Sequence, residues 1–288
     1  LVMSATLDGE RVAELLGDAE PAPIVTAEGR QYPVETRFRL PASGTGFGVR
    51  GRIEPAVVDA TLEALEREPG DVLVFLPGAA EIRRTAAMLE EALRGGAGAA
   101  PAPSSPLVAR GEPPSRFRVI PLHGTLPREE QDRAIAPSPP GERKVVLATS
   151  IAETSLTIEG VRVVIDSGLM RVPRFSPRTG MTRLETVTVT RDAADQRRGR
   201  AGRVGPGVCY RLWSEVDDAR LAPHRAPEIV SADLAPLALE LAAWGTADPA
   251  ELRWLDPPPD AAYAQARELL AGLGALDEEG AITEHGRR

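Results

Sequence analysis

The residues of this sequence best suited to chemistry are four arginines and two glycines gathered within residues 196–203 (QRRGRAGR). A guanidinium presents a planar fork of donors that matches phosphate oxygens, and glycine lets the backbone approach a ligand closely. Arg197, Arg200 and Arg203 follow one another at a spacing of three, so neighbours in this series share one face of a helix or tight turn. Like charges at this spacing repel, which predicts an anion opposite them. The alternative is a solvated basic helix face.

The charge around this stretch differs from that of the whole chain. The 288 residues carry a formal net charge of −8, whereas residues 171–203 hold nine arginines against three acidic residues. The electrostatic field that a phosphate backbone meets depends on local charge rather than on the average. The sequence therefore remains compatible with a nucleic-acid partner.

Two other short stretches accompany residues 196–203. Residues 148–158 (ATSIAETSLTI) lie about forty positions upstream, and Ser4-Ala5-Thr6 stands near the N-terminus. Together, and in this order, the three stretches resemble motifs III, V and VI of the DEAH-box helicases of superfamily 2, with the bacterial HrpB type of RNA helicase the most similar. The resemblance extends over nearly the whole chain, and the last two motifs are long enough to be specific.

The resemblance implies a role in ATP hydrolysis for residues 196–203. Arg200 and Arg203 would be arginine fingers that stabilise charge on the γ-phosphate, and Gln196 would hold the attacking water or that phosphate. Gly199 and Gly202 would let the turn approach the nucleotide. Arg197 and Arg198 are left open between this role and pairing with carboxylates.

Other nucleotide and nucleic-acid contacts follow from the same resemblance. Thr149 and Ser150 correspond to a Thr-Asn pair that contacts the nucleic-acid backbone, with Ser150 replacing the amide. Thr154 and Ser155 would touch the RNA phosphate or the catalytic water, and helix capping is the alternative for these hydroxyls. Ile135 occupies the position where eukaryotic members stack an aromatic ring on adenine, which predicts weak stacking and poor nucleotide selectivity.

Two further regions are candidates for binding nucleic acid. Gly78 and the turn around it offer backbone N–H groups to a phosphate, unless they form an ordinary helix start. Arg171, Arg174 and Arg178 lie on an expected β-hairpin, where they would contact the backbone or separate strands. A solvated hairpin is the alternative for these three arginines.

The apolar pattern predicts an α/β fold, a doubly wound parallel sheet with a protruding β-hairpin around residues 177–180, followed by short helices and turns. The resemblance implies that the sheet is RecA-like and that the last part is a small helical winged-helix domain. The first 20 residues are expected to end a first RecA-like lobe. Residues 21–214 are expected to form a second lobe with a disordered insert at about 95–116, and residues 215–288 the winged helix. The expected strands and helices are strands at 34–40, 72–76, 118–122, 144–148, 161–166 and 208–212, and helices at 54–68, 82–93, 129–135, 234–245 and 261–273.

The 288 residues contain no phosphate-loop pattern with its Lys-Ser/Thr pair and no Asp-Glu-x-His pattern. The sequence therefore predicts that this chain does not hydrolyse ATP alone. ATP and Mg²⁺ would be bound together with an N-terminal RecA-like lobe of the same protein, to which Ser4 and Thr6 would couple this one. We interpret the chain as a fragment that begins at motif III.

Composition excludes several other classes. Cys209 stands alone in an apolar context, which predicts a small buried strand residue and no internal disulfide. The three histidines are too scattered for a metal site, and no apolar run approaches the ~20 residues of a membrane span.

We predict a cytoplasmic, monomeric RNA helicase acting on single-stranded RNA, with DNA left open. The alternative is a helicase-derived binding module without catalysis. A small-molecule enzyme would need a nucleophile–base pair or dinucleotide fingerprint, and neither is present.

Overall fold

The computed structural model describes residue 2 and residues 9–26, 32–40, 52–95, 116–153, 157–246 and 248–288. The chain divides into two compact units, each described here by itself. The sheet unit comprises residues 29–172 and 186–224, and the terminal unit comprises residues 1–28, 173–185 and 225–288. Ser4, Thr6, Thr154, Ser155 and the interior of the expected insert lie outside the described residues.

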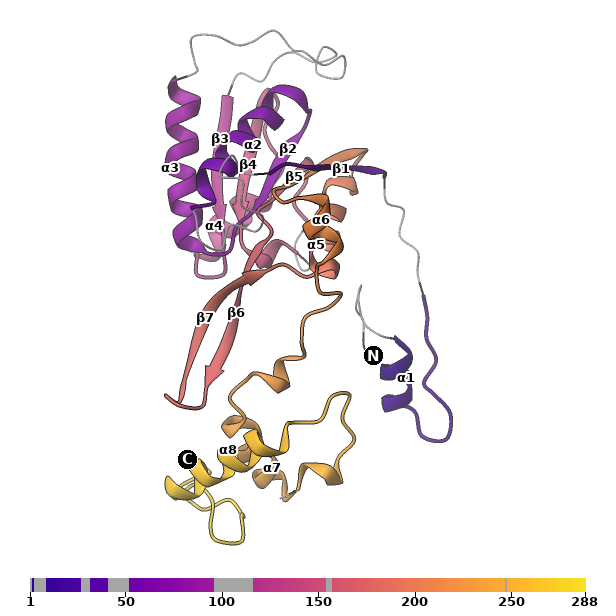
Figure 1. Ribbon diagram of the computed structural model, residues 1–288, viewed down its shortest axis with the longest axis vertical. Coiled ribbons are helices and arrows are strands. Elements are labelled where there is room, and N and C mark those ends of the chain that lie inside the picture. Colours follow the sequence, from indigo (N-terminus) through magenta and orange to yellow (C-terminus); the bar gives the residue numbers. More distant parts are fainter. Residues whose placement is uncertain are drawn as a thin grey trace. The chain divides into compact units, whose positions relative to one another are not determined.

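A six-stranded parallel sheet forms the centre of the sheet unit (Figure 1). Its order is β1-β8-β5-β2-β4-β3, and every pairing between neighbours is parallel. One of the two central strands, β2, is buried at every position because helices or loops cover both faces of a parallel sheet. The strands are β1 (Val34–Phe38), β2 (Asp71–Phe75), β3 (Arg116–Leu122), β4 (Glu142–Ala148), β5 (Val161–Asp166) and β8 (Gly207–Arg211).

Successive residues of each strand point to opposite faces of this sheet, and each face has its own core. Helices α2 (Glu54–Arg67) and α3 (Ala79–Gly95) cover one face, against alternate residues such as Val72 and Val145. The opposite face receives Ala134 of α4 (Arg128–Ile135) and Ala201 of the short 3₁₀-helix η3 (Arg200–Gly202). It also receives Ala152 and Ile158, which lie within the motif V stretch, residues 148–158. Residues of motifs V and VI therefore lie on this second face.

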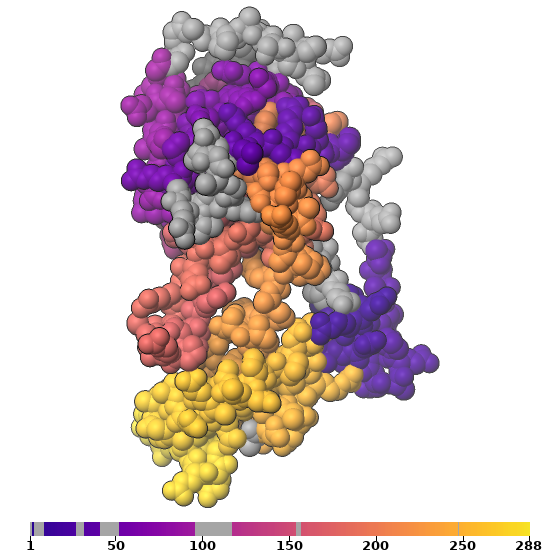
Figure 2. Space-filling model, in the orientation of Figure 1, coloured from indigo at the N-terminus to yellow at the C-terminus, as the bar shows by residue number. Residues whose placement is uncertain are grey.

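The expected β-hairpin is confirmed. Strands β6 (Leu169–Ser176) and β7 (Met181–Thr188) form a separate two-stranded sheet, and a turn over residues 177–180 joins them. The turn closes with Gly180 at φ +63°, a left-handed conformation that glycine adopts without strain. The far half of the hairpin belongs to the terminal unit, in which Phe175 N–H donates to the Ser231 carbonyl at 3.2 Å. The surfaces of these two segments adjoin in Figure 2.

The terminal unit has a small core of its own, built mainly from α7 (Ala235–Trp244) and α8 (Asp260–Gly272). Helix α7 ends at Gly245, whose φ of +96° is the left-handed conformation usual after a helix. An isolated antiparallel bridge joins Leu276 to Ile282, within residues 215–288, where a winged-helix domain is expected. The smaller elements of both units are η2 (Ser150–Ala152), α5 (Arg191–Gly199), α6 (Glu215–Ala219), η4 (Glu228–Val230) and η5 (Pro249–Glu251).

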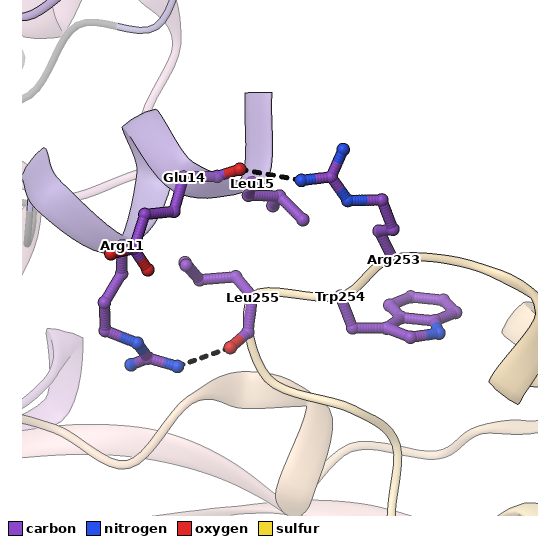
Figure 3. A pocket seen from close by; sticks show the side chains of 6 residues that line it. All are labelled: Arg11, Glu14, Leu15, Arg253, Trp254 and Leu255. Atoms are coloured by element: carbon purple, nitrogen blue, oxygen red, sulfur yellow. Dashed lines mark hydrogen bonds between the residues drawn. The ribbon is translucent and has the colours of Figure 1, made fainter. Parts of the chain in front are cut away.

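Helix α1 (Gly9–Leu16) lies in the terminal unit, where two arginines join it to residues 253–256. Arg253 donates to the carbonyls of Glu14 at 2.7 Å and Gly17 at 2.8 Å, at the C-terminal end of α1. In the other direction, Arg11 donates to the Leu255 carbonyl and to Asp256 Oδ1, the latter at 3.0 Å. These contacts surround a shallow pocket of about 320 Å³ (Figure 3).

Among the helices that the structure describes, none combines the length and apolar character that a membrane span requires. The same residues contain no group of three or more His, Cys, Asp or Glu side chains placed to hold a metal ion. Cys209 is a fully buried residue of β8, as the sequence predicts.

Candidate nucleotide and nucleic-acid site

The arginine-rich stretch begins in helix α5 and continues through η3 into the loop before β8. Helix α5 begins after the extended residue Thr190, and η3 follows it without a break at Gly199. Gly202 packs so closely that an added Cβ would lie 2.6 Å from the Tyr32 carbonyl oxygen. Tyr32 N–H also donates to the Gly202 carbonyl at 2.9 Å. Close packing against Tyr32 thus explains why position 202 is a glycine. The approach of this turn to a nucleotide stays a prediction.

Arg197 is buried, with 1% of its side chain exposed, and it forms ion pairs with two carboxylates. Its Nη2 lies 2.6 Å from Glu153 Oε1, and its Nη1 lies 2.8 Å from Asp166 Oδ1. Burial acts against the charge, but the carboxylates of Asp166 and Glu153 outweigh it and raise the pKa of Arg197. Pairing with carboxylates, which the sequence left open, is therefore the arrangement found for Arg197.

Arg200 and Arg203 differ from Arg197 in their surroundings. Arg200 is 5% exposed and donates through Nη2 to the carbonyl oxygen of Glu153. Burial, followed by the nearby charge of Arg203, lowers the pKa of Arg200 to about 10, while Glu153 acts in the opposite direction. Arg203 is exposed and donates to Thr157 Oγ1 at 2.6 Å. Arg200 therefore stays cationic near neutral pH, and its charge and that of Arg203 repel each other on this face.

The remaining residues of the stretch lie on α5. Gln196 is half-buried, and its amide has no hydrogen-bond partner within the part of the chain that the structure describes. Arg198 lies 3.8 Å from Asp195 Oδ1, one turn away. Asp195 also accepts from Arg211 at 2.7 Å, which joins α5 to the end of β8. The alternative prediction, a solvated basic helix face, is therefore wrong for Arg197 and Arg200, which are buried. Arg203 is exposed, as that alternative predicts.

Thr149 and Ser150 directly follow β4, at the carboxyl end of the strand, where ligands bind in doubly wound sheets. Thr149 N–H donates to the Leu122 carbonyl at 3.2 Å, and its own carbonyl accepts from Ala152. Ser150 begins the short helix η2 and is exposed. The two hydroxyl residues are thus at the sheet edge expected for them, while their contact with nucleic acid stays a prediction.

Ile135 ends helix α4, and Lys144 holds the main chain there. The Nζ of Lys144 donates to the carbonyls of Ala134 at 3.0 Å, Ile135 at 3.5 Å, and Ala136. Ile135 itself is half-buried. The main chain at Ile135 is therefore well supported, and the weak stacking of a base on its side chain stays a prediction.

Gly78 lies at the turn between β2 and α3 and is buried beneath an arginine side chain. An added Cβ on Gly78 would lie 2.4 Å from Arg171 Nη1, and Arg171 in turn lies 3.2 Å from Glu81 Oε2. In this arrangement Arg171 covers Gly78. Contact of Gly78 with nucleic acid would require this side chain to move, and the contacts of both residues stay predictions.

Arg174 and Arg178 lie in the far half of the hairpin. Arg174 pairs across the two strands with Glu185 at 3.2 Å, with both side chains at least half exposed. Arg178 lies in the exposed turn between the strands. Both arginines are exposed and therefore accessible to a phosphate backbone, and the exposed ion pair of Arg174 contributes little to stability.

Sequence patterns did not single out four residues that complete this face. Glu153 and Asp166 hold Arg197, Thr157 holds Arg203, and Lys144 holds the end of α4. Glu153 and Thr157 stand inside the motif V stretch, so their place in that motif was an available signal. The roles of Asp166 and Lys144 depend on which helices pack against β5 and β4, and no local pattern reports this.

The conserved C-terminal domain of helicases matches residues 56–205, which is more than half of this chain. The ATP-dependent RNA helicase HrpB of Escherichia coli K12 is 44% identical over 280 residues, covering 97% of this chain and 31% of HrpB. The pre-mRNA-splicing factor ATP-dependent RNA helicase prp22 of Schizosaccharomyces pombe is 37% identical, covering 100% of this chain and 23% of prp22. The human probable ATP-dependent RNA helicase DHX34 is 34% identical, covering 99% of this chain and 24% of DHX34.

Two crystal structures of E. coli HrpB, described as a DExH-box NTPase and as a DEAH/RHA helicase, are similar in fold to this chain. Their TM-scores are 0.77 and 0.80 at 43% sequence identity, and each covers 99% of this chain. The chain spans 31% and 32% of those two structures, and no more than a third of each relative named above. The chain belongs to the helicase conserved C-terminal domain family, and its parallel sheet has the RecA-like fold of the HrpB helicases.

Proposed function

We propose that this chain is the second RecA-like lobe, with a following winged-helix domain, of an ATP-dependent RNA helicase. Arg200 and Arg203 act as arginine fingers toward the γ-phosphate of an ATP molecule that a first lobe of the same protein binds. Gln196 orients the attacking water or that phosphate. Binding of ATP draws the two lobes together over single-stranded RNA, and hydrolysis lets them open, so that the strand moves 3′ to 5′.

One observation supports this proposal above the others: two guanidinium groups repel each other on the motif face, and one of them is 5% exposed. A phosphate bound beside these two cations would offset their repulsion. Negative charge develops on phosphoryl oxygens during transfer, and a fixed guanidinium stabilises it.

The side chains on this face suit a triphosphate but not its metal ion. Mg²⁺ prefers carboxylate and phosphate oxygens, and it supplies charge neutralisation across the β- and γ-phosphates when bound. Glu153 and Asp166 are both occupied by Arg197, and the described residues contain no cluster suited to a metal. We therefore assign the Mg²⁺ ligands to the first lobe, together with the phosphate loop.

RNA contacts in this proposal come from Thr149, Ser150 and Thr154, with Gly78 and the hairpin arginines Arg171, Arg174 and Arg178 as further contacts. Such contacts address the backbone rather than base edges, so binding would be tolerant of sequence and weakened by salt. Single-stranded DNA would compete with RNA for these contacts unless the protein recognises the 2′-hydroxyl group of RNA. We propose a monomeric protein that works in the cytoplasm.

RNA-stimulated ATP hydrolysis by the gene product that carries this chain with a first lobe tests the proposal. Arg203→Ala should lower hydrolysis by roughly a hundredfold or more, because an arginine finger contributes about 10³–10⁵ in rate, while RNA binding is kept. Arg198→Ala is the matched control: it removes a neighbouring cation whose carboxylate partner lies 3.8 Å away, and it should have little effect. Unchanged hydrolysis in Arg203→Ala would favour the module that only binds nucleic acid.

A further inference from the structure

The function proposed above leaves one buried cation of the site without a role. The guanidinium of Arg197 is enclosed on all sides that the structure describes, although its neighbours in sequence reach the surface. Its Nε and Nη2 both contact Glu153 Oε1, at 2.8 Å and 2.6 Å. Its Nη1 contacts Asp166 Oδ1 at 2.8 Å and the Leu169 carbonyl at 3.2 Å.

These contacts fix the plane of the guanidinium as well as its position. The central carbon of the group lies 4.9 Å from the centre of the Phe75 ring, so an aromatic face supports the cation while carboxylates hold its edges. A planar fork held in this way has little freedom to rotate. Arg197 therefore transmits any displacement of α5 directly to its partners.

Glu153 is the partner that connects Arg197 to the proposed fingers. Its carboxylate is bound by Arg197, while its carbonyl oxygen accepts a hydrogen bond from Arg200. One residue thus receives two arginines of the same stretch, through its side chain and through its main chain. If the carboxylate were released, the carbonyl that holds Arg200 would lose its anchor.

The other two contacts lead to the β-hairpin. Asp166 ends β5 and also accepts from Gly168 N–H at 2.9 Å, and Leu169 is the first residue of β6. Arg197 therefore joins three segments: motif V at Glu153, the end of β5, and the start of the hairpin strand.

We propose that Arg197 is a positioning residue: it fixes Glu153 so that the carbonyl of Glu153 orients Arg200 toward the nucleotide, and it holds this arrangement in register with the start of the hairpin. This inference rests on the proposed function, because it assumes that Arg200 is a finger. It adds a residue that acts on ATP hydrolysis without touching ATP.

Arg211 of β8, which pairs with Asp195 of helix α5, offers a matched control. Arg211 is 4% exposed, pairs with Asp195 and Asp218 at 2.7 Å each, and lies 5.6 Å from the Trp213 ring. Its ion pairs join β8 to α5 and α6, away from Glu153. Arg197→Lys and Arg211→Lys each keep a positive charge but lose the planar guanidinium fork. The two variants therefore differ mainly in which carboxylates lose their arginine partner.

The experiment measures steady-state hydrolysis of radiolabelled ATP with saturating RNA by the gene product that carries its first lobe. Each lysine variant is tested twice, once in the wild-type background and once together with Arg200→Ala. Arg197→Lys should lower kcat by roughly ten- to a hundredfold in the wild-type background, the effect of a misplaced group, with the KM for ATP nearly unchanged. In the Arg200→Ala background the same change should cost no more than about twofold, because the residue it positions is gone. Arg211→Lys should lower the melting temperature but change kcat by no more than about twofold in either background.

Glu153→Gln is a second variant for the case that Arg197→Lys does not fold, because it keeps an acceptor oxygen and removes the negative charge. Glu153→Gln should show the same loss of kcat, and that loss should again disappear in the Arg200→Ala background. Equal losses in the two backgrounds, or an equal loss in Arg211→Lys, would overturn the positioning role while leaving the fingers intact. Unchanged hydrolysis in Arg200→Ala alone would overturn the finger assignment and the positioning role together. Retained hydrolysis in folded Arg197→Lys would overturn the positioning role by itself.

Discussion

Arg203 Nη1 lies 2.6 Å from Thr157 Oγ1, so an exposed guanidinium of the arginine-rich stretch is held by a neutral hydroxyl of the motif V stretch. Among the described residues no carboxylate lies within ion-pair distance of Arg203, in contrast to Arg197 with its two carboxylates. A neutral partner orients the group without neutralising it, which leaves its charge available to a phosphate.

Removing this hydroxyl tests whether orientation of Arg203 matters. Thr157→Val keeps the shape of the side chain and should lower the rate of RNA-stimulated ATP hydrolysis by roughly two- to tenfold, corresponding to one hydrogen bond of about 0.5–1.5 kcal/mol. Thr125→Val is the control, because Thr125 is also exposed and loses one hydrogen bond, to His123 at 2.9 Å. Equal rates in wild type and Thr157→Val would show that Arg203 finds its position without this contact.

Nucleotide selectivity is the second prediction, and it depends on Ile135. An aliphatic side chain at the end of α4 offers no ring for a base, so the wild-type protein should hydrolyse ATP, GTP, CTP and UTP at comparable kcat/KM. Ile135→Phe should favour purine nucleotides, because stacking of a base on an aromatic ring is worth about 1–3 kcal/mol. Since Lys144 holds the main chain at Ile135, the new ring should occupy the same place. Strict use of ATP by the wild type would contradict this prediction.

Stability at high pH is the third prediction, and it depends on Cys209. Complete burial raises the pKa of this thiol from about 9 to about 12. Between these values the unfolded chain releases the thiol proton while the folded chain keeps it, so the free energy of unfolding falls as pH rises through this window. The decrease from this group is at most about 1.4 kcal/mol per pH unit.

Denaturant unfolding at pH 8, 9 and 10 measures the effect of Cys209, with Cys209→Ala as the comparison. The difference in unfolding free energy between wild type and variant should shrink as pH rises, because the variant lacks the ionising group. At pH 8 a thiol reagent should label the native wild-type protein far more slowly than the unfolded chain. A constant difference between the two proteins at all three pH values would contradict the assignment.

The attachment of helix α1 is the fourth prediction. Arg253 donates to two carbonyls at the C-terminal end of α1, where a cation also favours the helix dipole. Arg253→Ala should therefore destabilise α1 by about 1–3 kcal/mol, the sum of two hydrogen bonds. Amide hydrogen exchange should accelerate within residues 9–16, and Arg288→Ala, which removes an exposed arginine of the same unit, should leave it unchanged. Unaltered exchange in Arg253→Ala would mean that other contacts hold α1.

Local patterns in the sequence were sufficient for the elements of the sheet unit. Fully apolar runs such as residues 72–76 predict strands buried on both faces, and β2 is buried throughout. The turn chemistry of residues 177–180 predicts the hairpin, and it is present. These features depend on neighbours within a few residues, which is the range over which hydrophobic period and turn preference act. The order of the motifs along the chain likewise identified the family.

Only the tertiary structure decided which arginines of residues 196–203 are paired. Their spacing of three made Arg197, Arg200 and Arg203 look equivalent, but Arg197 is buried between Glu153 and Asp166, whereas Arg203 is exposed. The partners of Arg197 lie 44 and 31 positions away along the chain, and they meet it only because β5 and the motif V stretch pack beside α5. A sequence determines how many charges a segment carries. Burial and the arrival of distant carboxylates decide which of those charges are neutralised and which remain to bind a ligand.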